Sequence, residues 1–318
     1  MAGEDDTPQA VGRAALEAEL VDLAGPGPRL FADRSLMDRV GRESALVLAG
    51  ARAALLQLAH PFVARAVAEH SQVFTDVQAR FRRTLSAVYA LIYAPPAEAL
   101  ATARRIHAIH TQVEGALPET LGRHAAGSRY RANHVPALYW VAATLWDSSL
   151  LCHDLFFEPL TTAEKDAYLR ETVRFGRLFG IPAEAQPTSW ADFQAYQARM
   201  LRTGELAAGA DARAIAARLL APPRAAAAPF YLWLRAFTAG LLPPPLRAAF
   251  GLRYGPADRV VYTASVHTLR YVLPRLPAAL RHPPAWHRAQ ARDGLRPAPG
   301  PVVRLVPRVA LWLASEGR

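Results

Sequence analysis

Cysteine is nearly absent from the sequence, with Cys152 the only one in 318 residues. A single thiol excludes a disulfide framework within the chain and a metal site built from several thiolates. A reducing compartment is the simplest setting for such a chain. The first residues, Met-Ala-Gly-Glu-Asp-Asp, also lack the basic and apolar regions of a secretory signal. These absences lead us to expect a cytoplasmic protein.

Lysine is equally scarce, since Lys165 is the only one, although the formal net charge is +10. The positive charge is therefore carried by arginine, and the arginines are spread singly from Arg13 to Arg308. Nucleic-acid binders usually gather basic residues in one patch or arm. We therefore expect no nucleic-acid partner.

Long hydrophobic runs and strand patterns are missing as well. The most apolar stretch, residues 44–59, carries Arg52 and Gln57 and is shorter than the roughly 20 residues that a membrane-spanning helix needs. It is better interpreted as a buried helix. No sustained alternation of apolar and polar residues is present, and no Asn-Gly or Asp-Gly hairpin turn lies between β-branched runs. The strand content should be low.

Helix-forming residues fill the sequence instead. Ala, Leu, Arg and Glu dominate, and Pro and Gly divide the chain into segments of helical length. With 52% hydrophobic and 20% charged residues, we predict an all-α fold, a multi-helix bundle with a large interior. Thr161 or Thr162 with Glu164, and Ser189 with Asp192, are typical of helix starts. The predicted helices cover residues 36–59, 61–70, 76–93, 97–116, 136–157, 162–179, 189–201, 207–220, 226–241 and 256–274.

The predicted domain organisation has three parts. Residues 1–30 form a flexible N-terminal segment, 31–275 the main domain, and 276–318 a Pro- and Arg-rich extension. The extension includes the short apolar stretch Val302–Ala314, which carries Arg304 and Arg308. This stretch is either a docking helix or a weak contact with a membrane surface. Its length and its few basic residues favour docking.

Four of the ten histidines are candidates for binding a cofactor: His60, His70, His107 and His110. A neutral imidazole offers a nitrogen lone pair that can ligate haem iron axially, while its other N–H is held by a second acceptor. His107 and His110 are three apart in a predicted helix and lie on neighbouring parts of one face. The alternative for each is a histidine that is merely hydrogen-bonded in the core or at the surface.

A second cluster consists of Arg80, Arg83 and Thr84. Arg80 and Thr84 are four apart and share one helix face. Guanidinium groups pair with carboxylates such as haem propionates, and a threonine hydroxyl can hydrogen-bond a distal ligand or the backbone. The alternative is a solvated basic face. Phosphate loops, zinc-protease helices and serine-hydrolase elbows are absent from the sequence, and Glu114 after His110 has no repeated Glu-x-x-His partner for a dimetal site.

Four segments carry the most specific signal: Ala54–Pro61, Val67–Ser71, Arg80-Phe-Arg-Arg-Thr84 and His110-Thr-Gln-Val-Glu-Gly115. Together they resemble the rubber-oxygenase (latex-clearing) and MpaB-type oxygenase family, and the resemblance covers residues 36–275. Further segments keep the family's order, including Gly127–Ala132, Asp147-Ser148, Leu160–Glu164, Gly180–Pro182 and Leu242–Gly251. The chain departs from the pattern at Asn133–Pro136 and at Val141-Ala142.

This resemblance implies a globin-like helical core that holds haem b, with His110 as the proximal iron ligand. It also implies that Arg80 and Thr84 line the haem pocket and act in catalysis. Arg83 stands where rubber oxygenases carry a lysine that can occupy the distal iron position, and a guanidinium, which stays protonated, is a poor iron ligand. His60, His70 and His107 are lesser candidates for cofactor binding, as propionate partners or helix-end supports.

The function that the resemblance implies is a haem-dependent oxygenase. It would act with dioxygen on a small apolar substrate, such as an isoprenoid or another alkene-containing compound. Two alternatives stay open, because fold does not fix function. One is a haem-binding sensor or carrier without turnover, and the other is a cofactor-free helical interaction protein.

Overall fold

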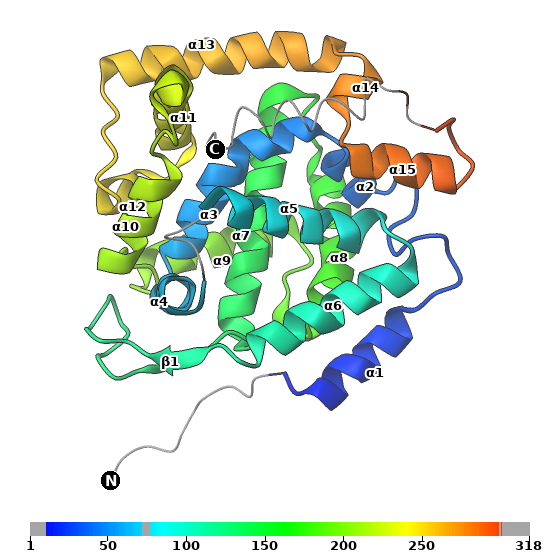
Figure 1. Ribbon diagram of the computed structural model, residues 1–318, viewed down its shortest axis with the longest axis horizontal. Coiled ribbons are helices and arrows are strands. Elements are labelled where there is room, and N and C mark those ends of the chain that lie inside the picture. Colours follow the sequence, from blue (N-terminus) through cyan, green and yellow to red (C-terminus); the bar gives the residue numbers. More distant parts are fainter. Residues whose placement is uncertain (1–10, 72–76, 299, 301–318) are drawn as a thin grey trace.

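A computed structural model describes residues 11–71, 77–298 and 300 of the chain. It confirms the predicted all-α fold: helices make up the body, and the described residues contain one small two-stranded sheet (Figure 1). The first half contributes α1 (Arg13–Leu23), α2 (Leu36–Gly41), the 3-10 helix η1 (Ser44–Ala49), α3 (Gly50–Leu58), α4 (Pro61–His70), α5 (Val77–Tyr93) and α6 (Pro96–His110). The second half contributes α7 (Val135–Phe156), α8 (Thr162–Arg177), α9 (Trp190–Arg202), α10 (Ala210–Leu219), α11 (Ala228–Leu241), α12 (Pro244–Ala249), α13 (Pro256–Val272), α14 (Ala278–Arg281) and α15 (Pro284–Arg292).

The central element is α7, which is surrounded by other helices (Figure 1). Its Trp140 and Trp146 are almost completely buried. Trp146 packs edge-on against Phe175 of α8, with ring centroids 4.8 Å apart, and the Trp140 indole donates a hydrogen bond to the Leu56 carbonyl of α3 at 2.9 Å. Aromatic packing of this kind gives the bundle a core in which α3, α7 and α8 have fixed positions.

Two helix starts match the predicted chemistry. Thr161 caps α8, accepting from the Glu164 backbone N–H while the Glu164 carboxylate accepts from the Thr161 N–H, which completes a capping box. Ser189 caps α9 by accepting from the Asp192 N–H at 3.1 Å. These local hydrogen bonds satisfy amide groups that a helix start leaves unpaired, which is why the sequence alone located them.

The helix predicted over residues 36–59 is wrong in its continuity. The structure divides this stretch into α2, η1 and α3. The break falls at Glu43, whose side chain is buried and accepts hydrogen bonds from Arg281 at 2.7 and 2.8 Å. A buried carboxylate needs such a partner. The ion pair therefore holds the junction between α2 and η1 against α14, which lies far along the sequence.

The helix predicted over residues 97–116 is wrong at its C-terminal end. It stops at His110, and Glu114–Ala116 (β1) pairs antiparallel with Arg129–Arg131 (β2). Gly115 lies opposite Tyr130, and a Cβ at this position would overlap the tyrosine ring. Because Gly115 has no side chain, the Tyr130 ring can lie directly against its backbone. Helical periodicity in the sequence cannot reveal such a contact.

The packed body extends beyond residues 31–275 on both sides. Leu16 and Leu20 of α1, and Trp286 of α15, are buried in the main core. Arg29 is also buried, and it forms an ion pair with Asp293 at 3.0 Å. Residues from both flanks thus contribute to one hydrophobic core, while the predicted segment Val302–Ala314 lies outside the described residues.

One side of the body is formed by α11 and α13, which pack against each other (Figure 1). No residue of α13 is buried, and Val260 and Tyr271 are largely exposed. Over the described residues no single helix is long and apolar enough to cross a membrane, whereas the consecutive pair Ser44–Leu58 and Pro61–His70, bent by 103°, meets the criteria of length and composition.

Candidate functional site

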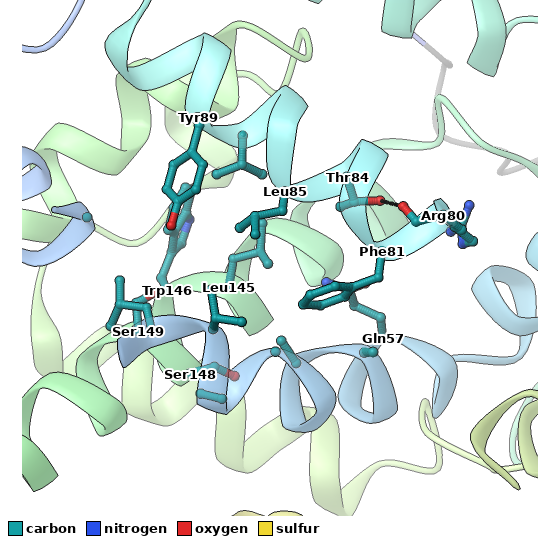
Figure 2. Close-up of a pocket in the computed structure, with 18 of the residues that line it drawn as sticks. Gln57, Arg80, Phe81, Thr84, Leu85, Tyr89, Leu145, Trp146, Ser148 and Ser149 are labelled. Carbon is teal, nitrogen blue, oxygen red and sulfur yellow. Dashed lines mark hydrogen bonds between the residues drawn. The ribbon is translucent and has the colours of Figure 1, made fainter. Parts of the chain in front are cut away.

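An apolar cavity of about 180 Å³ lies between α3, α5 and α7. Figure 2 shows α5 on one side of it and α3 and α7 on the other. Most of the lining side chains are aliphatic or aromatic, and a few polar groups converge on the space, which is the usual composition of a small-molecule site. These polar side chains include Gln57, Arg80, Thr84, Tyr89, Ser148, Ser149 and Tyr168.

Two residues predicted for the site, Arg80 and Thr84, line this cavity from α5. The Thr84 hydroxyl donates to the Arg80 carbonyl at 3.1 Å, and the Arg80 guanidinium donates to the Ser71 hydroxyl at 3.3 Å (Figure 2 shows the first bond). Burial, and then the charge of Arg83, lower the pKa of Arg80. Among the described residues no carboxylate lies within ion-pair distance of this guanidinium. A half-buried cation that has no counter-ion among the described residues can pair with an anionic ligand.

His110 is the last residue of α6 and is not among the residues that line the cavity. Burial lowers the pKa of His110 to about 4, and the nearby charges of His107 and Arg80 act in the same direction, against a hydrogen bond with Asn133 that raises it. The influence of Arg80 means that the two side chains lie within electrostatic reach of each other. At neutral pH the imidazole is therefore uncharged and has a lone pair available for a metal.

His107 lies one turn earlier and faces a different part of the molecule. Its pKa is lowered by burial and next by the charge of Arg13, whereas Glu17 raises it, so its electrostatic neighbours are on α1. Both ring nitrogens of His107 are buried without a hydrogen-bond partner among the described residues. The structure does not bring this side chain to the cavity.

The other predicted residues also lie outside the cavity. The His70 ring is at the end of α4, with Nε2 at 3.1 Å from the Glu114 carbonyl and 3.2 Å from the Tyr130 hydroxyl. His60 is buried at the junction of α3 and α4, and Arg83 is exposed on α5. The cavity therefore includes Arg80 and Thr84, with His110 within electrostatic reach of Arg80. The assigned roles of all seven residues stay predictions.

Sequence reasoning missed several residues of the cavity wall. Gln57 lines the cavity from α3, and its amide donates to the Thr144 hydroxyl at 3.1 Å. Ser148 lines it from α7, and its hydroxyl accepts from the buried Arg52 at 2.7 Å. The Asp147-Ser148 pair was among the segments that carry the family resemblance, so a signal for this wall existed. Gln57 lies in the segment Ala54–Pro61, which also carries the resemblance, but it was not singled out, because helical periodicity identifies a face but not the element that it faces.

Comparison with known families agrees with the sequence resemblance. A family model described as "ER-bound oxygenase mpaB/B'/Rubber oxygenase, catalytic domain" matches residues 37–271, which is more than half of the chain. No curated protein and no solved structure matches the chain. The matched segment includes α5, α6 and α7, and thus Arg80, His110 and Ser148.

Proposed function

The chain belongs to the family of ER-bound oxygenase mpaB and rubber oxygenase catalytic domains and is an oxygenase, and we propose that it uses haem b with His110 as the axial iron ligand. The observation that carries this proposal is the pairing of a neutral, half-buried imidazole with a half-buried guanidinium that lines an apolar cavity and has no counter-ion among the described residues. Haem has a matching set of groups: an iron, two carboxylates and an apolar macrocycle.

The described residues fit such a cofactor in their chemistry. His110 offers a lone pair at one ring nitrogen, and the Asn133 side chain is a polar neighbour that can orient the ring. Arg80 would pair with a propionate, whose negative charge complements the guanidinium. When bound, haem supplies the redox-active iron at which dioxygen chemistry takes place, while the protein supplies orientation and electrostatics.

Other residues of α5 have narrower roles in this proposal. Thr84 lines the cavity, and its hydroxyl, now bonded to the Arg80 carbonyl, is a donor that can turn toward a ligand. Arg83 is exposed and its guanidinium stays protonated, so it does not ligate the iron. We therefore expect the distal position to be left for dioxygen.

The proposed substrate is an apolar molecule, such as an isoprenoid or another alkene-containing compound. Support comes from the cavity wall, where Phe81, Leu85 and Trp146 present hydrocarbon surface to the space. Burying such a substrate is favourable by roughly 25 cal/mol per Å² of apolar surface removed from water. The few polar groups, such as Gln57 and Ser148, would fix its orientation.

The first test is the absorption spectrum of the purified full chain with added haem. We expect a Soret band for the wild type that is lost or shifted in His110→Ala and retained in His107→Ala, the matched control one helical turn away. Arg80→Met should keep the band but weaken haem affinity about 10- to 100-fold, since a charge-assisted hydrogen bond contributes roughly 1.5–3 kcal/mol.

Two outcomes would contradict the haem proposal. One is the absence of a Soret band in the wild type after haem addition, and the other is an unchanged band in His110→Ala. Oxygen uptake by the haem-loaded chain with an isoprenoid substrate then separates an oxygenase from a carrier. If oxygen binds reversibly and no product forms, the haem proposal is retained and the proposed isoprenoid substrate is contradicted.

A further inference from the structure

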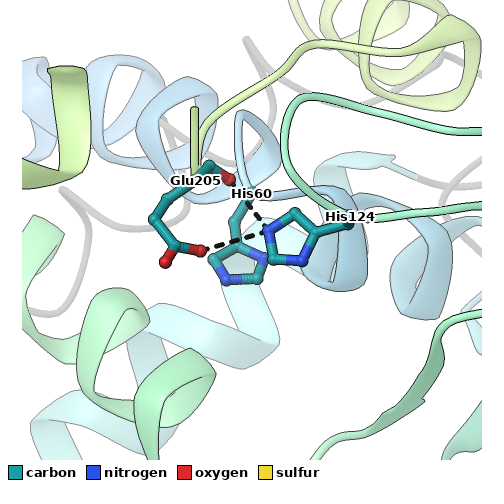
Figure 3. A group of neighbouring side chains, drawn as sticks. All are labelled: His60, His124 and Glu205. Atoms are coloured by element: carbon teal, nitrogen blue, oxygen red, sulfur yellow. Dashed lines mark hydrogen bonds and ion pairs between the residues drawn. The ribbon is translucent and has the colours of Figure 1, made fainter. Parts of the chain in front are cut away.

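A second group of possible metal ligands lies away from the cavity. His60, His124 and Glu205 each offer one ligand atom, and the three atoms lie within 4.8 Å of one another. Figure 3 shows the His60 and His124 rings side by side, with the Glu205 carboxylate directed at His124. None of the three residues lines the cavity beside α5. This cluster therefore needs an explanation of its own.

Three separate segments converge at the cluster. His60 begins α4, His124 closes a tight turn, and Glu205 lies in the loop after α9. The distance between His124 Nε2 and a Glu205 carboxylate oxygen is 3.2 Å. Two ligands at about 2.1 Å from one tetrahedral zinc ion are roughly 3.4 Å apart. The observed spacing is thus close to that of two ligands on a common ion.

The segments are fixed to one another by the backbone. Leu121 and His124 exchange two backbone hydrogen bonds across their turn, at 2.9 and 3.0 Å. The Arg123 N–H donates to the Gly204 carbonyl at 3.0 Å, and the Ala207 N–H donates to the Ala59 carbonyl at 2.7 Å. The chain neighbour of each ligand residue is thus hydrogen-bonded to another of the three segments, or lies next to a residue that is. Such preorganisation lowers the cost of binding an ion.

An independent observation points to a missing ligand. His60 is 4% exposed, and its Nδ1 is buried without a hydrogen-bond partner among the described residues. A neutral imidazole with an unpartnered buried nitrogen has a lone pair that can bind an ion. Leaving a buried polar atom unpaired costs about 1–3 kcal/mol. The His124–Glu205 ion pair alone does not relieve this cost, whereas a cation between the three side chains does.

We propose that His60, His124 and Glu205 form a site for a single Zn²⁺ ion, separate from the oxygenase cavity. Two imidazoles and one carboxylate are a donor set that suits zinc, and three protein ligands leave a fourth position for water. The Phe62 ring packs against both imidazoles, with centroids 5.5 Å from His60 and 4.7 Å from His124, and restricts access to the ion.

Around this site, the charged and titratable side chains include Arg123 and His134. Arg123 forms an ion pair with the Glu205 carboxylate at 2.8 Å and orients it. His134 has a buried Nδ1 without a partner among the described residues, and its pKa is lowered by burial and by His124. A water at the fourth position would have this ring in its surroundings, as an outer hydrogen-bonding group.

The test uses the full chain, freed of metal with a chelator and titrated with Co²⁺ as a spectroscopic substitute for zinc. We expect visible ligand-field bands that saturate at one Co²⁺ per chain and disappear when Zn²⁺ is added. His124→Ala and Glu205→Gln should each weaken Co²⁺ binding by more than about 100-fold, beyond the 10–100-fold effect of outer-shell changes. His267→Ala, which removes an exposed histidine of α13, should bind Co²⁺ as the wild type does.

A thermal readout covers the case in which a variant folds poorly. Zn²⁺ should raise the melting temperature of the metal-free wild type and of His267→Ala, because an ion that binds only the folded state stabilises it. It should leave Glu205→Gln unchanged, and this variant keeps an amide that can still contact His124. Failure of the wild type to bind Co²⁺, or equal binding by wild type and both ligand variants, would overturn the proposal. Neither readout depends on haem.

Discussion

Among single residues, His282 is the clearest case of a side chain that the fold holds in one protonation state. Its Nδ1 lies 3.0 Å from the Arg42 carbonyl, and its ring packs on Trp286 with centroids 4.5 Å apart. Burial lowers the pKa of His282 to about 4, although the nearby Glu43 carboxylate raises it. The unfolded chain, where this pKa is near 6.5, therefore binds the proton more tightly than the folded chain.

This difference predicts a loss of stability in acid. The free energy of unfolding should fall as the pH drops from 6.5 toward 4, because the proton favours the unfolded chain over that interval, and His282 alone accounts for at most about 3 kcal/mol. In His282→Asn, which keeps a donor for the Arg42 carbonyl but does not titrate, the decrease should be smaller. Urea unfolding of the metal-free and haem-free chain at several pH values measures both. Parallel curves for the two proteins would contradict the assignment.

Residue-level reasoning located some groups of the site and missed others. Arg80, Thr84 and His110 could be selected from the sequence because they lie in short segments that resemble those of a known family. His124 and Glu205 could not, since they belong to loops whose contact with His60 depends on hydrogen bonds between distant backbones. Spacing along the chain contains no information on such contacts.

At the scale of helices, Arg52 connects three of them behind the cavity wall. It lies on α3 and donates to the Asp147 carboxylate at 2.6 Å, to the Ser148 hydroxyl at 2.7 Å, and to the Leu241 carbonyl of α11 at 2.9 Å. Its side chain is only 6% exposed. A planar guanidinium satisfies three acceptors in different directions, which an ammonium group does less well.

Arg52→Ala should therefore lower the free energy of unfolding by about 3–5 kcal/mol, the cost of breaking a buried pair and leaving its partner charged. Arg52→Lys should recover part of this loss. Arg52→Met combined with Asp147→Asn should cost less than the sum of the two single changes, because the pair is removed together. Chemical denaturation gives these values. A loss below about 0.5 kcal/mol for Arg52→Ala, the usual range for surface changes, would contradict the proposed connection.

Helix positions were predictable where local chemistry decides them and not where tertiary contacts do. α4 begins at Pro61 and ends at His70 as predicted, and Thr161 starts α8 through its own capping box. The breaks at residues 42–43 and 111–116 depend on Arg281 and on Tyr130, which lie elsewhere in the sequence. Tertiary contacts overrode helix propensity at both points.

For the molecule as a whole, the matched family segment is smaller than the packed body. The family match ends at residue 271, yet Arg281 pairs with the buried Glu43, and Trp286 is 2% exposed in the main core. The late helices α14 and α15 thus complete interactions that begin in the first fifty residues.

A chain ending at Arg275 should for this reason lose its cooperative thermal transition or precipitate. Such a chain leaves the Glu43 carboxylate without Arg281 and exposes the core surface that Trp286 covers. Full-length Arg281→Met isolates the first effect, and we expect its melting temperature to fall by roughly 5–10 °C, at about 2–4 °C per kcal/mol. Calorimetry of both chains checks this. A truncated chain that melts like the full chain would show that residues 276–318 are dispensable for folding.

The ion pair between Arg29 and Asp293 has a consequence for synthesis on the ribosome. Arg29 is synthesised long before Asp293, and its buried ion pair is complete only after Asp293 has been translated. Domains of this size generally fold as units, and contacts between distant segments form slowly. The nascent chain therefore carries an unfinished, partly apolar surface until Asp293 has been made, and chaperones that bind nascent chains have a long interval in which to act.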